Sequence, residues 1–319
     1  MAVFLNERDV EALVTMSIAS SVVEEVMAEF SLGAAADIPR ERVRTKHTTQ
    51  HLLQGYVASR QAMGFKVYTV NADKVRFLVH IYDVNHGHLV GIIEARHLSM
   101  MRTGAASGIA TKYLANPDSK VLGIFGSGRQ AASQIEAVCL VRPIVEVKVF
   151  SRNAAKLSEF CSVMRERLKL DIRAVSSAEE TVRNSDIVTT ITNSATPLFD
   201  GAWLKQGTHI NAAGSNMLTR RELDESTLDR CNLIVVDSRA VAERECGDLL
   251  PVIEAGKLRW GQLAQLGDVI TGRAPARTSA DDITCFESHG MAVQDISLGT
   301  ALLKMAQERK LGIELPIGL

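Results

Sequence analysis

Residues 121–138, VLGIFGSGRQAASQIEAV, decide the fold of this chain. An apolar segment leads into a GxGxxA turn over residues 126–131, and a helical pattern follows. Gly126 permits a tight turn, Gly128 lets backbone N–H groups approach a pyrophosphate, and Ala131 keeps helix and sheet close. The N-terminus of the helix then faces the negative charge of the pyrophosphate. We therefore expect a dinucleotide to be held by the turn residues Gly126, Ser127, Gly128, Arg129 and Gln130.

Strand and helix patterns alternate along the chain that follows. We expect strands at 120–126, 146–151, 172–175, 186–192, 208–214 and 233–238, and helices that include 154–169 and 219–230. Alternation of this kind is typical of a parallel sheet with helices on both faces, and nearly continuous apolar strands fit such a sheet. The predicted fold class is therefore α/β, with a Rossmann-type doubly wound parallel sheet.

The two ends of the chain predict a second domain. Segments 65–70 and 76–95 have strand character, with a turn at Asn85-His86-Gly87, and a helix with small residues on one face follows at 101–115. A last amphipathic helix, at about 291–309, is expected to return to this part of the chain. We therefore expect an α+β substrate-binding and dimerisation domain from 1–118 plus 288–319, and a dinucleotide-binding domain from 119–287.

Composition narrows the class of protein. The chain has 319 residues, a formal net charge of −1, 46% hydrophobic and 23% charged residues, and the pattern of neither a signal peptide nor a transmembrane span. We expect a cytoplasmic enzyme with no nucleic-acid or membrane partner. The five cysteines are far apart and lack a CxxC pair, so reduced thiols are expected. His86 and His88 flank a hairpin tip without a third ligand, and no metal site is predicted.

The end of the second strand of the dinucleotide domain bears on the choice of cofactor. An NAD site usually places a carboxylate there to accept a hydrogen bond from the ribose 2′-hydroxyl. This chain has Ser151, Arg152 and Asn153 instead. Arg152 can pair with a 2′-phosphate, and its two neighbours can donate to it. The sequence therefore favours NADP(H) over NAD(H), while NAD stays open.

Four separated motifs together resemble the ornithine cyclodeaminase/mu-crystallin family. They are MRTGAASGIATKYLA (101–115), GIFGSGRQA (123–131), THINAAGS (208–215) followed by RREL (220–223), and DITCFESHGMAVQD (282–295). The resemblance implies a homodimer that acts on small amino acids or their imines with bound NAD(P). It also implies cofactor contacts from Thr103, Thr192, Ala213, Gly214, Ser215, Ser288, His289 and Gly290.

The resemblance further implies a set of cations that holds the substrate carboxylate. Arg44, Lys66 and Arg102 match its members, and a guanidinium grips a carboxylate through two parallel hydrogen bonds. Lys66 lies in an otherwise apolar strand, where a buried ammonium loses proton affinity and becomes a plausible proton donor. His47 is a candidate for a second carboxylate, as in an imine of the iminosuccinate kind.

One position separates the possible reactions. The cyclodeaminases carry an Asp as base in a segment that resembles residues 214–223, and this chain has Asn216 at that position. An amide cannot take a proton from the substrate, so amine loss by that route is not expected. The sequence therefore favours NAD(P)H-dependent reduction of the C=N bond of a small α-imino acid, with Lys66, Arg102 and Asn216 as catalytic candidates. An alanine-type amino-acid dehydrogenase and a cyclodeaminase-type ammonia lyase are the alternatives.

Overall fold

The computed structural model of the protein describes residues 2–71 and 75–317. The chain divides into a terminal unit, Met1–Arg102 with Gly290–Leu319, and a central unit, Thr103–His289. The sequence places these boundaries near residues 118 and 287. None of the helices in the described ranges combines the length and the apolar character needed to cross a bilayer.

The terminal unit contains one mixed sheet and the helices that pack on it. Its strands are β1 (Ala2–Leu5), β2 (Ala35–Arg44), β3 (Thr49–Val57), β4 (Ala62–Val70), β5 (Val75–Asp83), β6 (Leu89–Glu94) and β15 (Ile313–Leu315). Its helices are α1 (Glu7–Leu13), α2 (Met16–Ser31) and α11 (Ala292–Arg309). Helix α3 (Arg96–Leu114) begins in this unit and continues into the central one.

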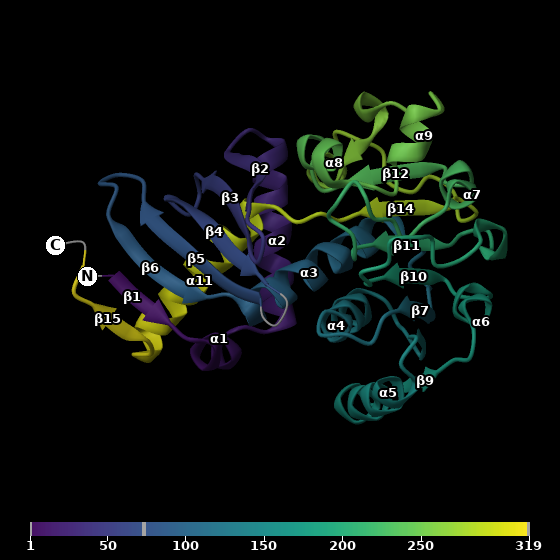
Figure 1. Ribbon diagram of the computed structural model, residues 1–319, viewed down its shortest axis with the longest axis horizontal. Coiled ribbons are helices and arrows are strands. Elements are labelled where there is room, and N and C mark those ends of the chain that lie inside the picture. The colour runs from purple at the N-terminus through teal and green to yellow at the C-terminus, as the bar shows by residue number, and fades with distance from the viewer. Residues whose placement is uncertain (1, 72–74, 318–319) are drawn as a thin grey trace. The chain divides into compact units, whose positions relative to one another are not determined.

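The sheet of the terminal unit has the order β15-β1-β6-β5-β4-β3-β2 and is antiparallel except between β1 and β6. Helix α11 packs on β2 to β5 and against α2, so the last helix does return to the first part of the chain (Figure 1). Alternation along β4 turns Lys66 and Tyr68 towards the covered face. Met63 and Phe65 consequently point to the opposite face.

The central unit is built on a parallel sheet. Its strands are β7 (Val121–Phe125), β8 (Glu146–Phe150), β9 (Asp171–Ala174), β10 (Ile187–Thr190), β11 (His209–Ala212), β12 (Leu233–Val236), β13 (Ala264–Gln265) and β14 (Thr284–Glu287). Its helices are α4 (Ala131–Val141), α5 (Ala154–Leu168), α6 (Ala178–Val182), α7 (Glu225–Asp229), α8 (Arg239–Glu245), α9 (Leu250–Glu254) and α10 (Leu266–Ile270), with short 3₁₀ turns at Gly201–Trp203 and Trp260–Gln262.

The strand order of this sheet is β13-β12-β14-β11-β10-β7-β8-β9, and every strand pair is parallel. Helices α4 and α5 lie on one side of the sheet and α6 and α7 on the other (Figure 1). The predicted doubly wound sheet and second sheet domain are therefore confirmed. The strand order reverses beside β7, where open α/β sheets bind ligands at the carboxyl ends of their strands.

One predicted helix is wrong over half of its length. We expect a helix at 219–230, but α7 spans only Glu225–Asp229, with Asp224 as its N-cap. The backbone N–H groups of Glu222 and Leu223 donate to the Asp248 carboxylate, at 2.5 and 2.7 Å, instead of entering a helix. The Glu222 carboxylate accepts from the N–H groups of Thr192 and Gly214, at 2.6 and 2.9 Å. A buried carboxylate network thus replaces the first helical turns.

Candidate functional site

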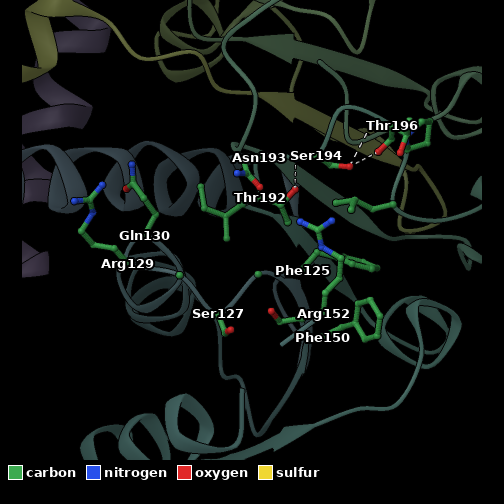
Figure 2. Close-up of a pocket in the computed structure, with 16 residues that line it drawn as sticks. Phe125, Ser127, Arg129, Gln130, Phe150, Arg152, Thr192, Asn193, Ser194 and Thr196 are labelled. Atoms are coloured by element: carbon green, nitrogen blue, oxygen red, sulfur yellow. Dashed lines mark hydrogen bonds between the residues drawn. The ribbon is translucent and has the colours of Figure 1, made fainter. Parts of the chain in front are cut away.

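A cavity of about 650 Å³ lies at the carboxyl ends of β7, β8 and β10 in the central unit. Figure 2 shows the glycine turn at Ser127 between Gln130 on one side and Arg152 with Phe150 on the other. The lining residues are Phe125, Gly126, Ser127, Gly128, Arg129, Gln130, Phe150, Ser151, Arg152, Ile191, Thr192, Asn193, Ser194, Thr196, Pro197 and Leu198.

The glycine turn fits a dinucleotide pyrophosphate. Gly126 has φ +114°, and a Cβ there would stand 2.7 Å from the carbonyl oxygen of Ile191, so only glycine suits the turn. A Cβ at Gly128 would meet nothing within 4 Å, which shows open space beside its backbone. Helix α4 follows, and the side chain of its N-cap residue, Gln130, makes no capping hydrogen bond. Its first N–H groups are suited to phosphate oxygens.

The cavity brings together eight of the cofactor residues predicted from the sequence: Gly126, Ser127, Gly128, Arg129, Gln130, Ser151, Arg152 and Thr192. Asn153 does not line it, because its side-chain oxygen accepts from the N–H of Lys156 and caps α5. Sequence reasoning missed Phe125, Phe150, Ile191 and, in the loop 193–198, the lining residues Asn193, Ser194, Thr196, Pro197 and Leu198. The position of that loop directly after a parallel strand, β10, is the signal that could have found it.

Hydrogen bonds to Glu222 connect the loop that carries Gly214 to Thr192, a residue that lines the cavity. Glu222 bridges the N–H groups of Thr192 and Gly214, although Ala213, Gly214, Ser215 and Asn216 do not themselves line the cavity. Burial raises the pKa of Glu222 to about 7, against the effect of its hydrogen bonds with Thr192 and Thr190. Asn216 is half-buried in this loop.

A second group of functional side chains lies in the terminal unit. Lys66, on β4, donates from Nζ to Oδ1 of Asp295 at 2.8 Å, and Arg102 donates from Nε to the same oxygen at 3.2 Å. Arg102 also donates from Nη1 to Oε1 of Gln294 at 3.1 Å. Lys66 and Asp295 are 2% and 0% exposed, so both charges lie away from solvent. Gly290 adopts φ +80° against the Arg102 guanidinium, which any side chain at 290 would displace.

The surroundings of Lys66 make it a weak base. Burial lowers its pKa from the ordinary value of 10.5 to about 7, and the charges of Arg102 and Arg40 act in the same direction. The carboxylate of Asp295 opposes this effect. The Phe77 ring, whose centre lies 5.3 Å from Nζ, also favours the ammonium form. Lys66 can therefore hold and release a proton near neutral pH.

Strand β2 contributes further cations. Arg40 is 5% exposed, whereas Arg44 and His47 are exposed at the end of β2 and in the turn that follows. His51 stacks on Tyr68 with ring centres 4.2 Å apart. Burial, together with the charges of Arg42, Arg40 and Arg44, lowers the pKa of His51 to about 4, so this imidazole is neutral at neutral pH. Arg44 and His47 stay predictions.

Asp295 and Arg40 are the functional candidates that sequence reasoning missed. Asp295 is 229 residues from Lys66 and 193 from Arg102 along the chain. Within the quoted DITCFESHGMAVQD motif, an acidic residue in the first turn of a helix is the available signal. Arg40 lies on β2, the same strand as Arg44, which matches the family resemblance. Arg40 is buried, whereas Arg44 is exposed.

The remaining predicted residues lie in the central unit outside the cavity. Thr103 accepts a hydrogen bond at its backbone carbonyl from Gln134. Ser288 and His289 follow β14 and are buried, and the His289 N–H donates to Asp237 at 2.8 Å. Their contacts with a cofactor stay predictions.

A family model identifies the family of this chain. The model of the ornithine cyclodeaminase/mu-crystallin family matches residues 1–310. The chain belongs to this family. A Δ(1)-pyrroline-2-carboxylate reductase of Bacillus cereus is 35% identical over 260 residues, which cover 79% of this chain and 80% of the relative.

Two solved structures of this kind are similar over nearly the whole chain. The Thermococcus litoralis Δ(1)-pyrroline-2-carboxylate reductase, in complex with NADH and L-proline, has a TM-score of 0.94 and 31% identity and covers 98% of this chain and 100% of its own. An archaeal alanine dehydrogenase dimer with bound NAD has a TM-score of 0.93 and 29% identity, with 99% of each chain covered. The family resemblance stated from four sequence motifs is therefore confirmed.

Proposed function

We propose that this protein is an oxidoreductase that uses NAD(P)H to reduce the C=N bond of a small α-imino acid to the amino acid. The observation that carries the proposal is Lys66, a buried lysine with a pKa of about 7 that shares the Asp295 carboxylate with Arg102. Relatives that reduce pyrroline-2-carboxylate support the same reaction class.

The substrate carboxylate is the group that the cations of the terminal unit are suited to bind. Lys66 carries three N–H donors and Arg102 five, more than Asp295 and Gln294 accept. Arg40 adds a buried positive charge close enough to lower the pKa of Lys66. Arg44 and His47 are proposed to extend the site towards a second carboxylate.

Proton delivery is the role that we assign to Lys66. Reduction of C=N requires one proton at nitrogen, and the bound nicotinamide supplies the hydride at carbon. Asp295 keeps a fraction of Lys66 protonated at neutral pH, since without its charge burial would lower the pKa further. Asn216 is proposed to hydrogen-bond the imine nitrogen or the nicotinamide amide.

The alternatives are not favoured. Asn216 stands where the cyclodeaminase base is expected, and an amide cannot serve as that base. Alanine oxidation would need the same groups in the reverse direction, and a lysine held partly protonated suits proton donation to an imine.

We also propose a preference for NADP(H). Arg152 lines the cavity beside Phe150, at the end of β8 where a carboxylate would favour NAD (Figure 2). Arg152→Ala should weaken NADPH binding by about 10-fold or more and NADH binding by less than about 3-fold, because only NADPH carries the 2′-phosphate that the guanidinium would bind. Fluorescence titration with both cofactors measures this, and an equal loss for both would contradict the preference.

A homodimer is the proposed assembly. Cross-strand pairing places Ile38, Val43, Tyr56 and Met63 on one face of the terminal unit's sheet, where these side chains are 39% to 65% exposed. Helix α11 packs on the opposite face, which carries Lys66. An apolar sheet face of this kind marks an interaction surface, and the archaeal alanine dehydrogenase of the same fold is a dimer.

A panel of imines tests the proposed reaction. Nicotinamide absorbance would be followed with NADPH and NADH against pyrroline-2-carboxylate, piperideine-2-carboxylate, and pyruvate or oxaloacetate mixed with ammonia or methylamine. We expect oxidation with at least one member. If no imine of the panel causes cofactor oxidation and ornithine is converted to proline and ammonia, the protein is a lyase and the proposal is contradicted.

A further inference from the structure

Three side chains with metal-binding atoms converge in the central unit beyond the dinucleotide cavity. Cys246, Glu287 and His289 each offer one ligand atom, and these atoms all lie within 4.8 Å of one another. All three residues are buried, with exposures between 0% and 4%. The sequence gives no hint of this grouping, because Cys246 lies about forty positions before the other two.

The fold explains how the three meet. Glu287 ends β14, and His289 lies two positions later along the extended chain. Cys246 is the C-cap residue of α8, which follows β12, and β12 pairs directly with β14. The ligands thus come from the end of β14, from the segment directly after it, and from the C-terminal end of the helix that follows the neighbouring strand β12.

From this convergence we propose that Cys246, Glu287 and His289 form a binding site for a borderline transition-metal ion of the Zn²⁺ class. One sulfur, one oxygen and one imidazole nitrogen are the donor types that Zn²⁺ takes in proteins. Three protein ligands leave a fourth tetrahedral position for water or another small ligand.

Asp237 holds His289 in place within the cluster. Its Oδ2 accepts from the His289 backbone N–H at 2.8 Å, and its Oδ1 lies 3.7 Å from His289 Nδ1. Both side chains are buried. At 3.7 Å the Asp237 carboxylate lies beside the His289 ring but beyond hydrogen-bond distance of Nδ1, and its hydrogen bond to the backbone fixes the position of His289. A small movement of the ring would bring Nδ1 into the hydrogen bond that orients a metal-binding histidine.

Further acidic and sulfur-containing side chains border the site. The carboxylates of Glu222 and Asp248 are close enough to Glu287 for their charges to act on it. Cys285 Sγ lies 4.0 Å from Oε1 of Glu287, so a second sulfur atom lies close to the same carboxyl group. As the Cys246 Sγ–metal bond forms, the thiol proton leaves to solvent, and no oxidant or reductant is needed.

Co²⁺, a spectroscopic substitute for Zn²⁺, tests the site on the full-length protein without a histidine tag after treatment with a chelator. We expect one equivalent of Co²⁺ to produce a thiolate-to-metal charge-transfer band, which one equivalent of Zn²⁺ abolishes. Cys246→Ser should remove the band. His289→Gln and Asp237→Asn should each keep it at saturation and weaken binding by about 10-fold or more.

Cys139→Ser is the matched control, because Cys139 is a half-buried free thiol on α4, outside the cluster. It should leave the spectrum and the affinity unchanged. Lack of a charge-transfer band in the wild-type protein would overturn the proposal, and so would a band that persists in Cys246→Ser. If Cys246→Ser fails to fold, the proposal is decided by whether His289→Gln lowers the Co²⁺ affinity. Neither readout depends on reductase activity.

Discussion

Lys66 and Asp295 form the charge pair on which the proposed chemistry depends. Their 2.8 Å hydrogen bond lies in the interior of the terminal unit, where an isolated ammonium would be strongly disfavoured. The pair therefore holds Lys66 near the point at which it exchanges a proton at physiological pH. Two predictions follow from this geometry at the scale of single residues.

Lys66→Met should lower kcat for imine reduction by about 100-fold or more, because it removes the proposed proton donor together with one carboxylate ligand. Steady-state kinetics with the imine that the panel identifies measures the loss. Lys304→Met, at an exposed position on α11, is the matched control and should leave kcat within about 2-fold of the wild-type value. A Lys66→Met enzyme with near-normal kcat would exclude Lys66 as the donor.

Asp295→Asn should shift the pH profile of kcat. Activity requires protonated Lys66, so kcat falls as the pH rises through its pKa of about 7. The Asp295 charge raises that pKa, and its removal should therefore move the basic limb of the profile to lower pH. The measurement is kcat against pH at saturating substrate.

Gln294→Met serves as the control for this shift, because Gln294 accepts a hydrogen bond from Arg102 and none of the bonds above joins it to Lys66. For Gln294→Met we expect a higher KM and a basic limb of the kcat–pH profile at the same pH as in the wild type. A limb that stays in place in Asp295→Asn would show that Asp295 has only a structural role.

At this scale the sequence predicts the cations better than their partner. Arg102 lies in one of the four motifs and Lys66 matches the family resemblance within an apolar strand, and the structure brings the two together on one carboxylate oxygen. Asp295 could not be predicted because it contacts Lys66 and Arg102 only once α11 has packed on the sheet. For the same reason burial, which distinguishes Arg40 from Arg44, cannot be known before β2 is placed in the sheet.

The glycine turn is the decisive feature at the scale of elements. Gly126 is required by backbone conformation, whereas Gly128 borders open space. Gly126→Ala should therefore destabilise the fold by about 1–3 kcal/mol and also weaken cofactor binding, since a Cβ there meets the Ile191 carbonyl. Gly128→Ala should leave stability nearly unchanged and weaken cofactor binding alone. Thermal unfolding and cofactor titration of both variants separate the two effects, and equal stability losses would refute this distinction.

Strands β7 to β12 of the central unit could be predicted because apolar runs alternate regularly with helical segments, whereas β13 and β14 were not predicted. The six predicted strands overlap β7 to β12 along the chain. The helix expected at 219–230 fails because buried carboxylates compete for backbone N–H groups. Asp248 accepts those of Glu222 and Leu223, and that competition involves residues far apart in sequence.

At the scale of the whole molecule, the exposed apolar face of the terminal unit's sheet predicts self-association. Met63 lies at the start of the inner strand β4 and pairs with Tyr56 on one side and Tyr82 on the other. Met63→Glu should convert the proposed dimer to a monomer, because it would bury a charge at the interface. Sedimentation velocity measures the change.

Leu140→Glu is the matched control for Met63→Glu. Leu140 is 50% exposed, but it lies on α4 of the central unit. This variant should retain the dimer. A wild-type protein that is monomeric at micromolar concentration would contradict the proposed assembly.

The transfer of deuterium from cofactor to product tests the central claim most directly. The protein would be incubated with pyrroline-2-carboxylate, or with the most active imine of the panel, and with NADPH or NADH deuterated on both hydrogens at C4 of the nicotinamide ring. NMR of the amino acid formed should show one deuterium at Cα for each cofactor oxidised. An amino acid with hydrogen at Cα, or no amino acid from any imine, would contradict the assignment of this chain as an imine reductase.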